Sequence, residues 1–351
     1  MRIGVFSKFD CAGGSEFRCV ELANAISDAA GHRGVLLAEK RIPDRILAAV
    51  RPGVEIRQDV LSKPALEPLY SVDRLLVVNT DSRDFTTADY WHGKTDRHHH
   101  RVDLARMQSM TFLFNFIVSP ARHLTTIEEY VKDLRIITGN AKFFNEISEQ
   151  DRYELVRHYP RMQLESPIHP DSTSTEKSPS ARLRFGMHSK PLGSKWSNDF
   201  RRLIEAVNEK HGERVSWDFM GMPRPAADAL RGIPNVTVRQ EFALSVKEFL
   251  RNVDVFVYFL SWAREEPWSR SAAEALASGC PVITTASGGN PDQVVHGNNG
   301  YLCRNVGDFL TYCLLMIEHP RRRLALRRNA VACARHFLSG EVIRRLLLFV
   351  E

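Results

Sequence analysis

Short apolar runs alternate with amphipathic segments along the whole chain. A mostly apolar run of four to seven residues, bounded by turn-forming residues, is typical of a strand that is buried on both faces. Such runs fall at residues 2–6, 34–38, 74–78, 114–118, 183–186, 215–219, 253–259 and 281–285. Helices are expected between them, for example at residues 16–30 and 199–210. The alternation predicts an α/β protein with parallel sheets.

A polar segment divides this pattern into two halves. Residues 166–181 are rich in Ser, Thr and Pro and have almost no apolar content, which is typical of a linker. We therefore expect a Rossmann-like domain at residues 1–165 and a second one at residues 182–335, which a chain of 351 residues allows. A last helix is expected at residues 336–351, and a crossing of this helix back to the first domain is left open.

Two glutamates, Glu266 and Glu274, lie eight positions apart at the start of a predicted helix. Pro267 has a fixed φ and no N–H, so it suits the first helical position and makes Glu266 a cap-like residue. Gly279 suits the C-terminal cap of this helix. At a rise of 1.5 Å per residue, the two carboxylates would lie about 12 Å apart along the axis. They can therefore hold one extended polyhydroxyl ligand at two places.

Small and polar residues follow the two glutamates in a fixed order. They are Ala275, Gly279, Pro281, Val282, Gly288, Gly289 and residues 297–302. The whole set resembles the donor-site signature of retaining GT-B glycosyltransferases, especially glycosyltransferase family 4. The resemblance implies two Rossmann-like doubly wound domains that face a central cleft. It also implies retaining transfer of a sugar from a nucleotide-diphosphate sugar to a hydroxyl acceptor such as a glycan or a lipid-linked saccharide, without a cofactor and generally without a bound metal.

The resemblance assigns roles to individual residues of this segment. Glu274 would hold the ribose hydroxyls of the donor, Glu266 would hold hydroxyls of the transferred sugar, and Ser269 is expected to contact the substrate. Lys190 and Lys195, five positions apart on the loop after a strand, would neutralise the diphosphate leaving group. Lys190 stands where the family usually has Arg, and this removes a bidentate contact. Taken alone, the two lysines are equally compatible with a solvated loop.

Glycine-rich loops and one histidine complete the expected binding residues. Gly13 and Gly14 follow the first strand, where glycines and free helix amides suit a phosphate or an acceptor, although a tight turn is the alternative. Gly288 and Gly289 can bring backbone N–H groups close to the transferred sugar. His92 falls where the resembling family often has a His-Gly pair on the acceptor side, and a structural role is its alternative.

Composition is that of an ordinary globular protein, with 43% hydrophobic and 26% charged residues. The sequence contains no run of 18 apolar residues, so no membrane-spanning helix is predicted. The first apolar run is too short for a signal peptide. The six cysteines have neither metal-site nor disulfide spacing, so we expect a cytoplasmic protein. Three consecutive histidines at residues 98–100 cannot all face one ion, and no metal site is expected.

The net charge of +6 is concentrated in the last helices of the chain. Their arginine clusters fall at residues 321–323, 327–328 and 344–345. Their apolar positions are Leu324, Leu326, Val331 and Phe337, so packed amphipathic helices are expected. The alternative is attraction to an anionic partner, either a membrane surface with peripheral attachment or nucleic acid.

Two other functions are compatible with the same fold. One is a catalytically idle protein that binds a glycan or a nucleotide, and the other is a sugar-nucleotide epimerase. The intact pair Glu266 and Glu274 favours an enzyme, whereas Lys190 in place of Arg leaves room for the idle protein.

Overall fold

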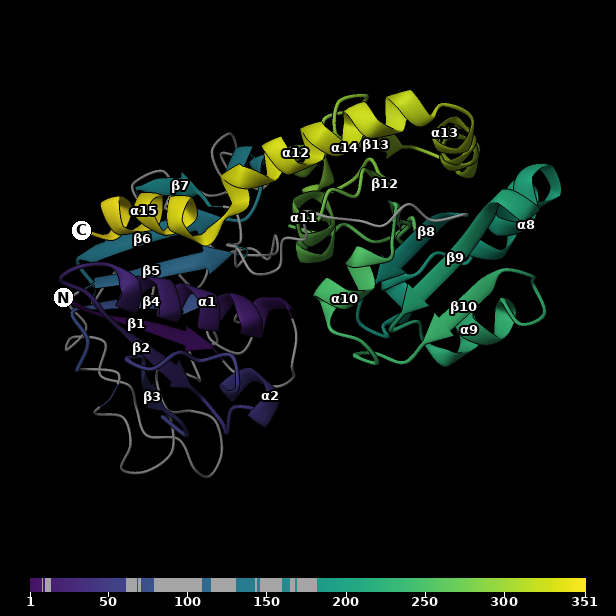
Figure 1. The fold of residues 1–351 in the computed structure, drawn as a ribbon. Coiled ribbons are helices and arrows are strands. Elements are labelled where there is room, and N and C mark those ends of the chain that lie inside the picture. The colour runs from purple at the N-terminus through teal and green to yellow at the C-terminus, as the bar shows by residue number, and fades with distance from the viewer. Residues whose placement is uncertain are drawn as a thin grey trace. The chain divides into compact units, whose positions relative to one another are not determined.

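The computed structural model describes residues 1–7, 9, 14–60, 68, 71–78, 109–114, 131–142, 144–145, 160–164, 168 and 182–351. The chain divides into two compact units, each with its own hydrophobic core (Figure 1). The first unit is Met1–Pro167 with Ser339–Glu351, and the second unit is Ile168–Leu338. The last helix of the chain, α15 (Ser339–Val350), therefore belongs to the first unit.

The first unit is built on a parallel sheet of seven described strands in the order β3-β2-β1-β4-β5-β6-β7. Its elements besides α15 are β1 (Arg2–Ser7), α1 (Gly14–Asp28), β2 (Arg33–Ala38), α2 (Asp44–Leu47), β3 (Glu55–Arg57), β4 (Arg74–Val78), β5 (Ser109–Phe114), β6 (Asp133–Thr138) and β7 (Arg161–Gln163). Helix α15 packs against α1, and Arg135 of β6 donates a hydrogen bond to the carbonyl of Phe349. The last helix is thus tied to the sheet of the first unit.

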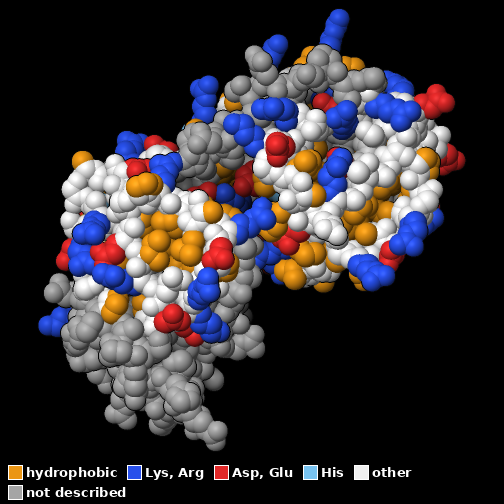
Figure 2. Space-filling model, turned by 60° about the horizontal axis from the view of Figure 1, so that its bottom comes forward, with side chains coloured by type: hydrophobic (Ala, Val, Ile, Leu, Met, Phe, Trp, Pro, Cys, Tyr) orange, Lys and Arg blue, Asp and Glu red, His pale blue; other side chains and the backbone are white. Residues whose placement is uncertain are grey.

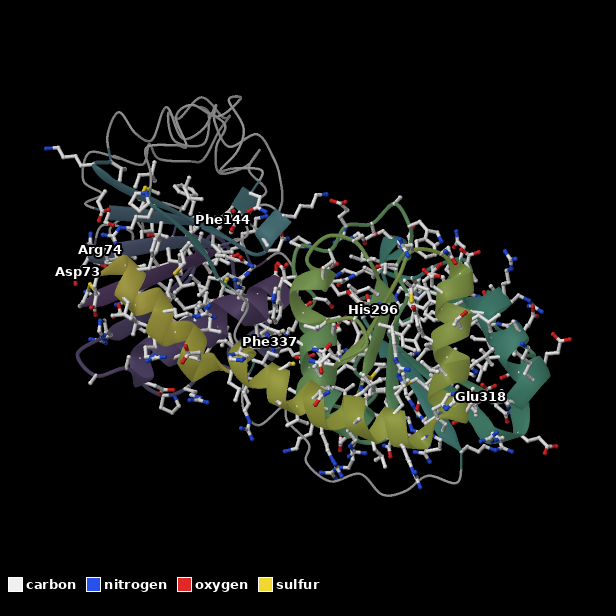
Figure 3. The ribbon with its side chains drawn as sticks, turned by 90° about the horizontal axis from the view of Figure 1, so that it is seen from above. Asp73, Arg74, Phe144, His296, Glu318 and Phe337 are labelled. Carbon is white, nitrogen blue, oxygen red and sulfur yellow. The ribbon has the colours of Figure 1, made fainter. Side chains whose placement is uncertain are left out.

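The second unit is built on a six-stranded parallel sheet in the order β10-β9-β8-β11-β12-β13. Its first half comprises β8 (Leu183–His188), α8 (Phe200–His211), β9 (Val215–Met220), α9 (Arg224–Ala229), β10 (Val236–Arg239) and α10 (Val246–Arg251). Its second half comprises β11 (Val255–Tyr258), α11 (Arg270–Ala277), β12 (Val282–Thr285), α12 (Asn290–Gln293), β13 (Gly300–Cys303), α13 (Val306–Glu318) and α14 (Pro320–Ala334). Figure 3 labels Glu318 and Phe337, which lie just beyond the two ends of α14.

These two doubly wound parallel sheets confirm the predicted fold class. All residues of β11 and β12 are buried, as expected for strands covered on both faces. Of the strand predicted at residues 114–118, only Phe114 lies within the residues that the structure describes, and it is the last residue of β5. Ser109 and Thr111 interrupt the apolar run of β5 in the sequence, although the sheet buries both of them.

The basic helix α14 packs through fewer apolar side chains than its sequence predicts. Leu326 and Ala330 are buried, but Leu324 is 53% exposed, so it is not part of the packed face. Figure 2 shows Lys and Arg side chains interspersed with Asp and Glu on the face in view. Among the described residues, no helix combines the length and the apolar content needed to cross a membrane.

The cysteines that the structure describes are free thiols. Burial raises the pKa of Cys19 and of Cys313 far above the ordinary value, so both remain protonated. Cys280 is also buried, and its Sγ contacts the carbonyl of Val253 at 3.2 Å. These side chains therefore act as small packing residues of the two cores.

The close approach of β13 to β12 gives a prediction about stability. Gly300 pairs with Val282, and a Cβ placed on Gly300 would meet the Val282 carbonyl oxygen at 2.0 Å. Because the backbone must shift to make room, we expect Gly300→Ala to lower the free energy of unfolding by roughly 1–3 kcal/mol. Urea denaturation followed by circular dichroism measures the change. Gly340→Ala is the control, since a Cβ there has nothing within 4 Å. An equal loss in both variants would contradict this account.

Candidate functional site

The candidate site lies at the carboxyl edge of the second sheet, where β8 and β11 are neighbours. From β8 the chain adds β9 and β10 on one side, and from β11 it adds β12 and β13 on the other. The order of a doubly wound sheet reverses at such a pair, and ligands bind in the crevice outside the strand ends there. The loops that follow β8 and β11 carry Lys190, Lys195 and Glu266.

The loop after β8 is fixed by hydrogen bonds that place its lysine. The indole N–H of the buried Trp196 donates to the carbonyl of Lys190 at 3.0 Å, which closes the loop on itself. The backbone N–H of Ser197 donates to the carbonyl of Phe259 at 3.0 Å, and this ties the loop to the end of β11. Lys195 lies between these anchors as the last residue of the short 3₁₀ helix Gly193–Lys195. Its position is therefore set by backbone contacts on both sides.

The helix that carries Glu274 begins later than predicted. Helix α11 starts at Arg270, and its N-cap is Ser269, whose hydroxyl accepts the N–H of Ala272. The buried Gln293 side chain also holds the backbone N–H and carbonyl of Ser269. The prediction of a helix start at Pro267 is therefore wrong, because a serine that caps with its side chain determines the start. Glu266 lies outside the helix, and the estimate of about 12 Å along the axis does not apply.

Glu266 lies in a nearly buried cluster of opposite charges. Its Oε2 is 2.5 Å from Lys195 Nζ and 3.5 Å from Arg264 Nε, and the side chains of Glu266 and Lys195 are only 10% and 14% exposed. Burial alone would lower the pKa of Lys195, but Tyr258 and Glu266 raise it above the ordinary lysine value. Burial and the Glu266 carboxylate raise the pKa of Tyr258, so its phenol stays protonated beside the lysine. Lys195 is therefore held as a cation.

Glu274 lies in a second cluster on the first turns of α11. Its Oε1 is 2.7 Å from Arg270 Nε, and its Oε2 is 3.6 Å from Nε2 of His188, the last residue of β8. Burial raises the pKa of Glu274, although the Arg270 guanidinium opposes this shift. Burial lowers the pKa of His188 to about 3, and the Arg270 charge adds to the effect, so this ring is neutral. The carboxylate thus has one cationic and one neutral neighbour.

The two glycines after β12 are used to hold Glu266. Gly288 has a φ of +58°, and a Cβ there would meet the Glu266 carbonyl oxygen at 2.3 Å. The N–H of Gly289 donates to the same carbonyl at 2.8 Å. We expected these N–H groups to approach a sugar, whereas the Gly289 N–H is bonded within the chain. Ser269 likewise has a buried side chain engaged in capping, which differs from the substrate contact that we expected.

The structure brings together Lys195 and Glu266 as predicted neighbours, and it places Lys190 on the loop of Lys195. Gly14 is the first residue of α1 in the first unit. Gly13 and His92 lie outside the residues that the structure describes, as do residues 98–100.

Sequence reasoning missed four members of the two clusters, namely Tyr258, His188, Arg264 and Arg270. Arg270 could have been found, because it lies four residues before Glu274 on the helix, a spacing that favours an ion pair.

The two clusters combine hydroxyl acceptors with cations in one place. Three cations, Lys195, Arg264 and Arg270, lie against two carboxylates, so one positive charge is in excess. Carboxylates are multi-site acceptors for hydroxyl groups, and the cations suit phosphate oxygens. The arrangement therefore fits a ligand that carries both hydroxyls and phosphates.

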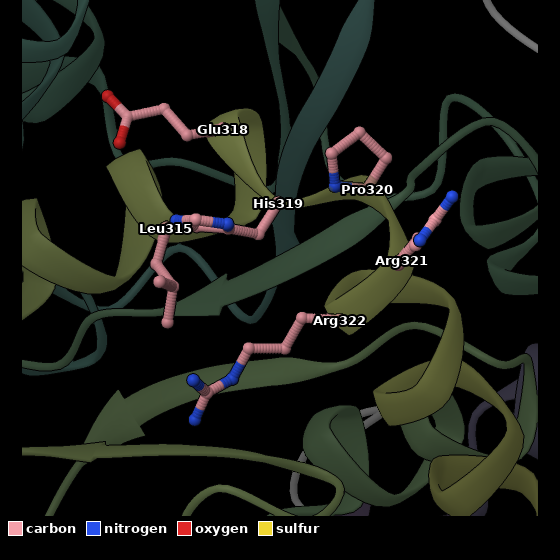
Figure 4. Close-up of a pocket in the computed structure, with 6 residues that line it drawn as sticks. All are labelled: Leu315, Glu318, His319, Pro320, Arg321 and Arg322. Carbon is pink, nitrogen blue, oxygen red and sulfur yellow. The ribbon is translucent and has the colours of Figure 1, made fainter.

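Two cavities lie elsewhere in the second unit, and no residue of the clusters lines them. A cavity of about 570 Å³ lies at the junction of α13 and α14, where Glu318, His319 and Arg322 line it (Figure 4). A cavity of about 530 Å³ lies around the end of α8. Helices α8 and α13 both end at the edge of the sheet where the strands begin. These cavities therefore lie at the opposite edge from the clusters, which are at the carboxyl edge.

Comparison with known proteins relates this segment to a family model. Residues 192–319, which include Lys195, Glu266 and Glu274, match the family model described as glycosyl transferases group 1. Spore coat protein SA of Bacillus subtilis (strain 168) is 47% identical over 76 residues, a stretch that covers 20% of this chain and 20% of that protein. The chain thus matches only about a fifth of the length of this curated relative.

Solved structures are similar over the whole chain. Alr3699/HepE from Anabaena, solved in complex with UDP and glucose, has a TM-score of 0.72 and 15% identity over 99% of this chain and 98% of that one. A glycosyltransferase from Rickettsia africae ESF-5 has a TM-score of 0.73 and 13% identity over 99% and 97% of the two chains. Likeness at this identity establishes the fold. This chain has the two-domain GT-B fold, and its residues 192–319 match the model of the group 1 glycosyl transferases.

Proposed function

We propose that this protein is a retaining hexosyltransferase that moves a sugar from a nucleotide-diphosphate sugar to a hydroxyl acceptor. One observation carries the proposal: two carboxylates, each paired with a cation, lie at the switch point of the second sheet inside the segment that matches the group 1 family. Because Alr3699/HepE was solved with UDP and glucose, UDP-sugars are the first donors to test.

The two carboxylates suit two different parts of such a donor. Glu274, on the first turns of α11, accepts hydrogen bonds from the ribose hydroxyls. Glu266, on the loop before the helix, accepts them from hydroxyls of the transferred sugar. Both carboxylates are nearly buried, so their hydrogen bonds to the donor form with little competition from water. The donor is therefore recognised at its two ends.

Lys195 is the residue that we assign to the leaving group. In the structure its ammonium group is bound to Glu266. When the donor enters, phosphate oxygens take over the ammonium, and sugar hydroxyls take over the carboxylate. As the glycosidic bond breaks, negative charge grows on the leaving oxygen, and a cation already in place stabilises it without reorganisation. Lys190 from the same loop adds a second cation. We therefore propose that the side chains of Lys195 and Lys190 neutralise the diphosphate.

The acceptor is assigned to the first unit, with Gly13, Gly14 and His92 as the expected contacts. Both carboxylates of the clusters are paired with cations and assigned to hydroxyl groups of the donor, so we assign no covalent intermediate. The acceptor hydroxyl attacks from the side of the leaving group, and a phosphate oxygen takes its proton.

We also propose a reducing, cytoplasmic location, because the described cysteines are free thiols. An anionic membrane surface is the partner that the arginines of α14 would suit.

Nucleotide binding tests the assignment of Glu274. Replacement of Glu274 by Gln keeps the shape and removes the charge, so we expect the affinity for UDP or the preferred nucleoside diphosphate to fall about tenfold or more. Isothermal titration calorimetry with UDP, GDP and ADP measures it. The matched control is Glu318→Gln, at the opposite edge of the sheet, where Glu318 pairs with His211. Unchanged affinity in Glu274→Gln would contradict the assignment.

Transfer kinetics test the assignment of Lys195. Lys195→Met keeps most of the side-chain volume and removes the cation, so we expect kcat to fall roughly 100- to 1,000-fold. Release of nucleoside diphosphate, measured with and without a hydroxyl acceptor, gives the rate. Lys247→Met on α10 is the control, because Lys247 is exposed. Diphosphate release that needs no acceptor, or none from any donor, would favour the epimerase or the idle binding protein.

The alkaline pH profile tests the charge state of Lys195. Its pKa lies above the ordinary lysine value, so the ammonium is retained through the alkaline range in which a free lysine begins to lose its charge. We therefore expect the affinity for the nucleoside diphosphate to stay within about twofold between about pH 7 and about pH 9.5. Calorimetric titrations across this window check it. A steep fall near pH 8 would mean that a lysine of lowered pKa binds the diphosphate.

A further inference from the structure

His188 is a buried polar residue to which the transfer chemistry assigns no task. It is the last residue of β8, and it is only 6% exposed. Its ring meets Phe249 edge-on with centroids 5.7 Å apart, and it meets Phe256 in the same way at 5.4 Å. A phenylalanine would fill this apolar surrounding equally well. The imidazole nitrogens therefore need an explanation of their own.

The Nε2 atom of His188 is buried and has no hydrogen-bond partner among the described residues. Buried polar atoms are nearly always paired, so an unpaired one marks a place where a contact is made in another state. The polar atom that it faces is Glu274 Oε2 at 3.6 Å, just beyond a normal hydrogen bond. A movement of a few tenths of an ångström would complete the bond.

The other oxygen of Glu274 is already held. Arg270 Nε lies 2.7 Å from Oε1 along the same helix, so Arg270 fixes one side of the carboxylate and leaves rotation about that contact. A second contact at Oε2, from a different element, would fix the plane of the group. His188 comes from β8 and Glu274 from α11, so this contact would also join the end of β8 to the helix that follows β11.

The charge state of the ring suits this task. Burial lowers the pKa of His188, and the nearby Arg270 opposes a second positive charge. A neutral imidazole with its proton on Nε2 donates one hydrogen bond to a carboxylate and adds no charge. Glu274 then remains an anionic acceptor with lone pairs left for a ligand. A lysine or arginine at this position would neutralise the carboxylate and compete with the ligand's hydroxyls.

We propose that His188 is a positioning residue for the nucleotide: when the donor binds, its Nε2–H donates to Glu274 Oε2 and orients this carboxylate toward the ribose hydroxyls. The inference rests on the proposed function, in which Glu274 holds the ribose. Its effect is confined to recognition of the ribose, because Lys195 and Glu266 hold the diphosphate and the transferred sugar. Loss of the bond therefore weakens donor binding and leaves the chemical step at saturating donor unchanged.

The experiment compares ribose and dideoxyribose nucleotides. Affinities are measured by calorimetry for UDP, GDP and ADP and for their 2′,3′-dideoxy forms, and the base that binds tightest is used. His188→Phe keeps the ring packing on Phe249 and Phe256 and removes both nitrogens. We expect it to bind the ribonucleotide at least about fivefold more weakly than the parent does, with no change for the dideoxy form. We also expect kcat at saturating donor to stay within about twofold.

Rescue variants separate positioning from packing. The amide nitrogen of glutamine reaches about as far as Nε2 of histidine, whereas that of asparagine does not. We therefore expect His188→Gln to recover most of the affinity for the ribonucleotide and His188→Asn to recover none. This pair keeps the proposal testable if His188→Phe does not fold. His211→Phe, at the opposite edge of the sheet, is the matched control and should bind both nucleotides as the parent does.

The outcomes distinguish this inference from the function on which it rests. If the parent binds no nucleoside diphosphate, or binds ribose and dideoxyribose forms equally, the role of Glu274 fails and the inference fails with it. If the parent prefers the ribose form but His188→Phe keeps that preference, the function stands and the positioning role is overturned. Equal weakening of both nucleotides in His188→Phe also overturns it, because that result indicates a general loss of packing.

Discussion

Burial of charge is the constraint on which the carboxyl edge of the second sheet depends. Glu266 and Glu274 are both buried, and an ionised carboxylate in such a place costs several kcal/mol unless an opposite charge and hydrogen bonds compensate it. Lys195 and Arg270 are those opposite charges. The ion pairs in turn need fixed loops, because a small displacement would leave a charge unpaired. The indole of Trp196 fixes the loop after β8, and the cap at Ser269 fixes the start of α11.

The fold was predictable because burial on both faces leaves continuous apolar runs. Seven of the eight predicted runs coincide with strands that begin within two residues of the expected position. The run predicted at residues 114–118 does not include residues 109–113 of β5, and this has a physical cause. Ser109 and Thr111 are buried within β5, and a polar residue that finds a partner inside a sheet breaks the apolar pattern without breaking the strand. The last helix could be expected, but only its contacts with α1 and Arg135 assign it to the first unit.

The candidate site was predictable only in part. The spacing of Glu266 and Glu274 and the resemblance of their segment to a known family pointed to both glutamates and to Lys195. Tyr258 was not found, because a tyrosine inside an apolar run is indistinguishable from a core residue. The start of α11 was misplaced since Pro267 is a good first helical residue, while the cap at Ser269 is reinforced by Gln293, which lies 24 positions away. The contact of Gly288 with the backbone of Glu266 is likewise a meeting of two loops that no local pattern reveals.

The balance of charges at this edge explains why the two glutamates have different neighbours. Lys195, Arg264 and Arg270 lie against Glu266 and Glu274, which leaves one positive charge in excess. Under the proposed function, this excess charge and Lys190 would offset the two negative charges of the donor's diphosphate. When the sugar leaves, a further negative charge develops on the leaving oxygen, and only interactions that strengthen at that moment accelerate the reaction. Lys195 is placed to make such an interaction, whereas a cation at His188 would strengthen binding of the ground state and of the product alike. Under the proposed function, a neutral ring beside Glu274 therefore leaves the positive charge at Lys195, where the leaving group would need it.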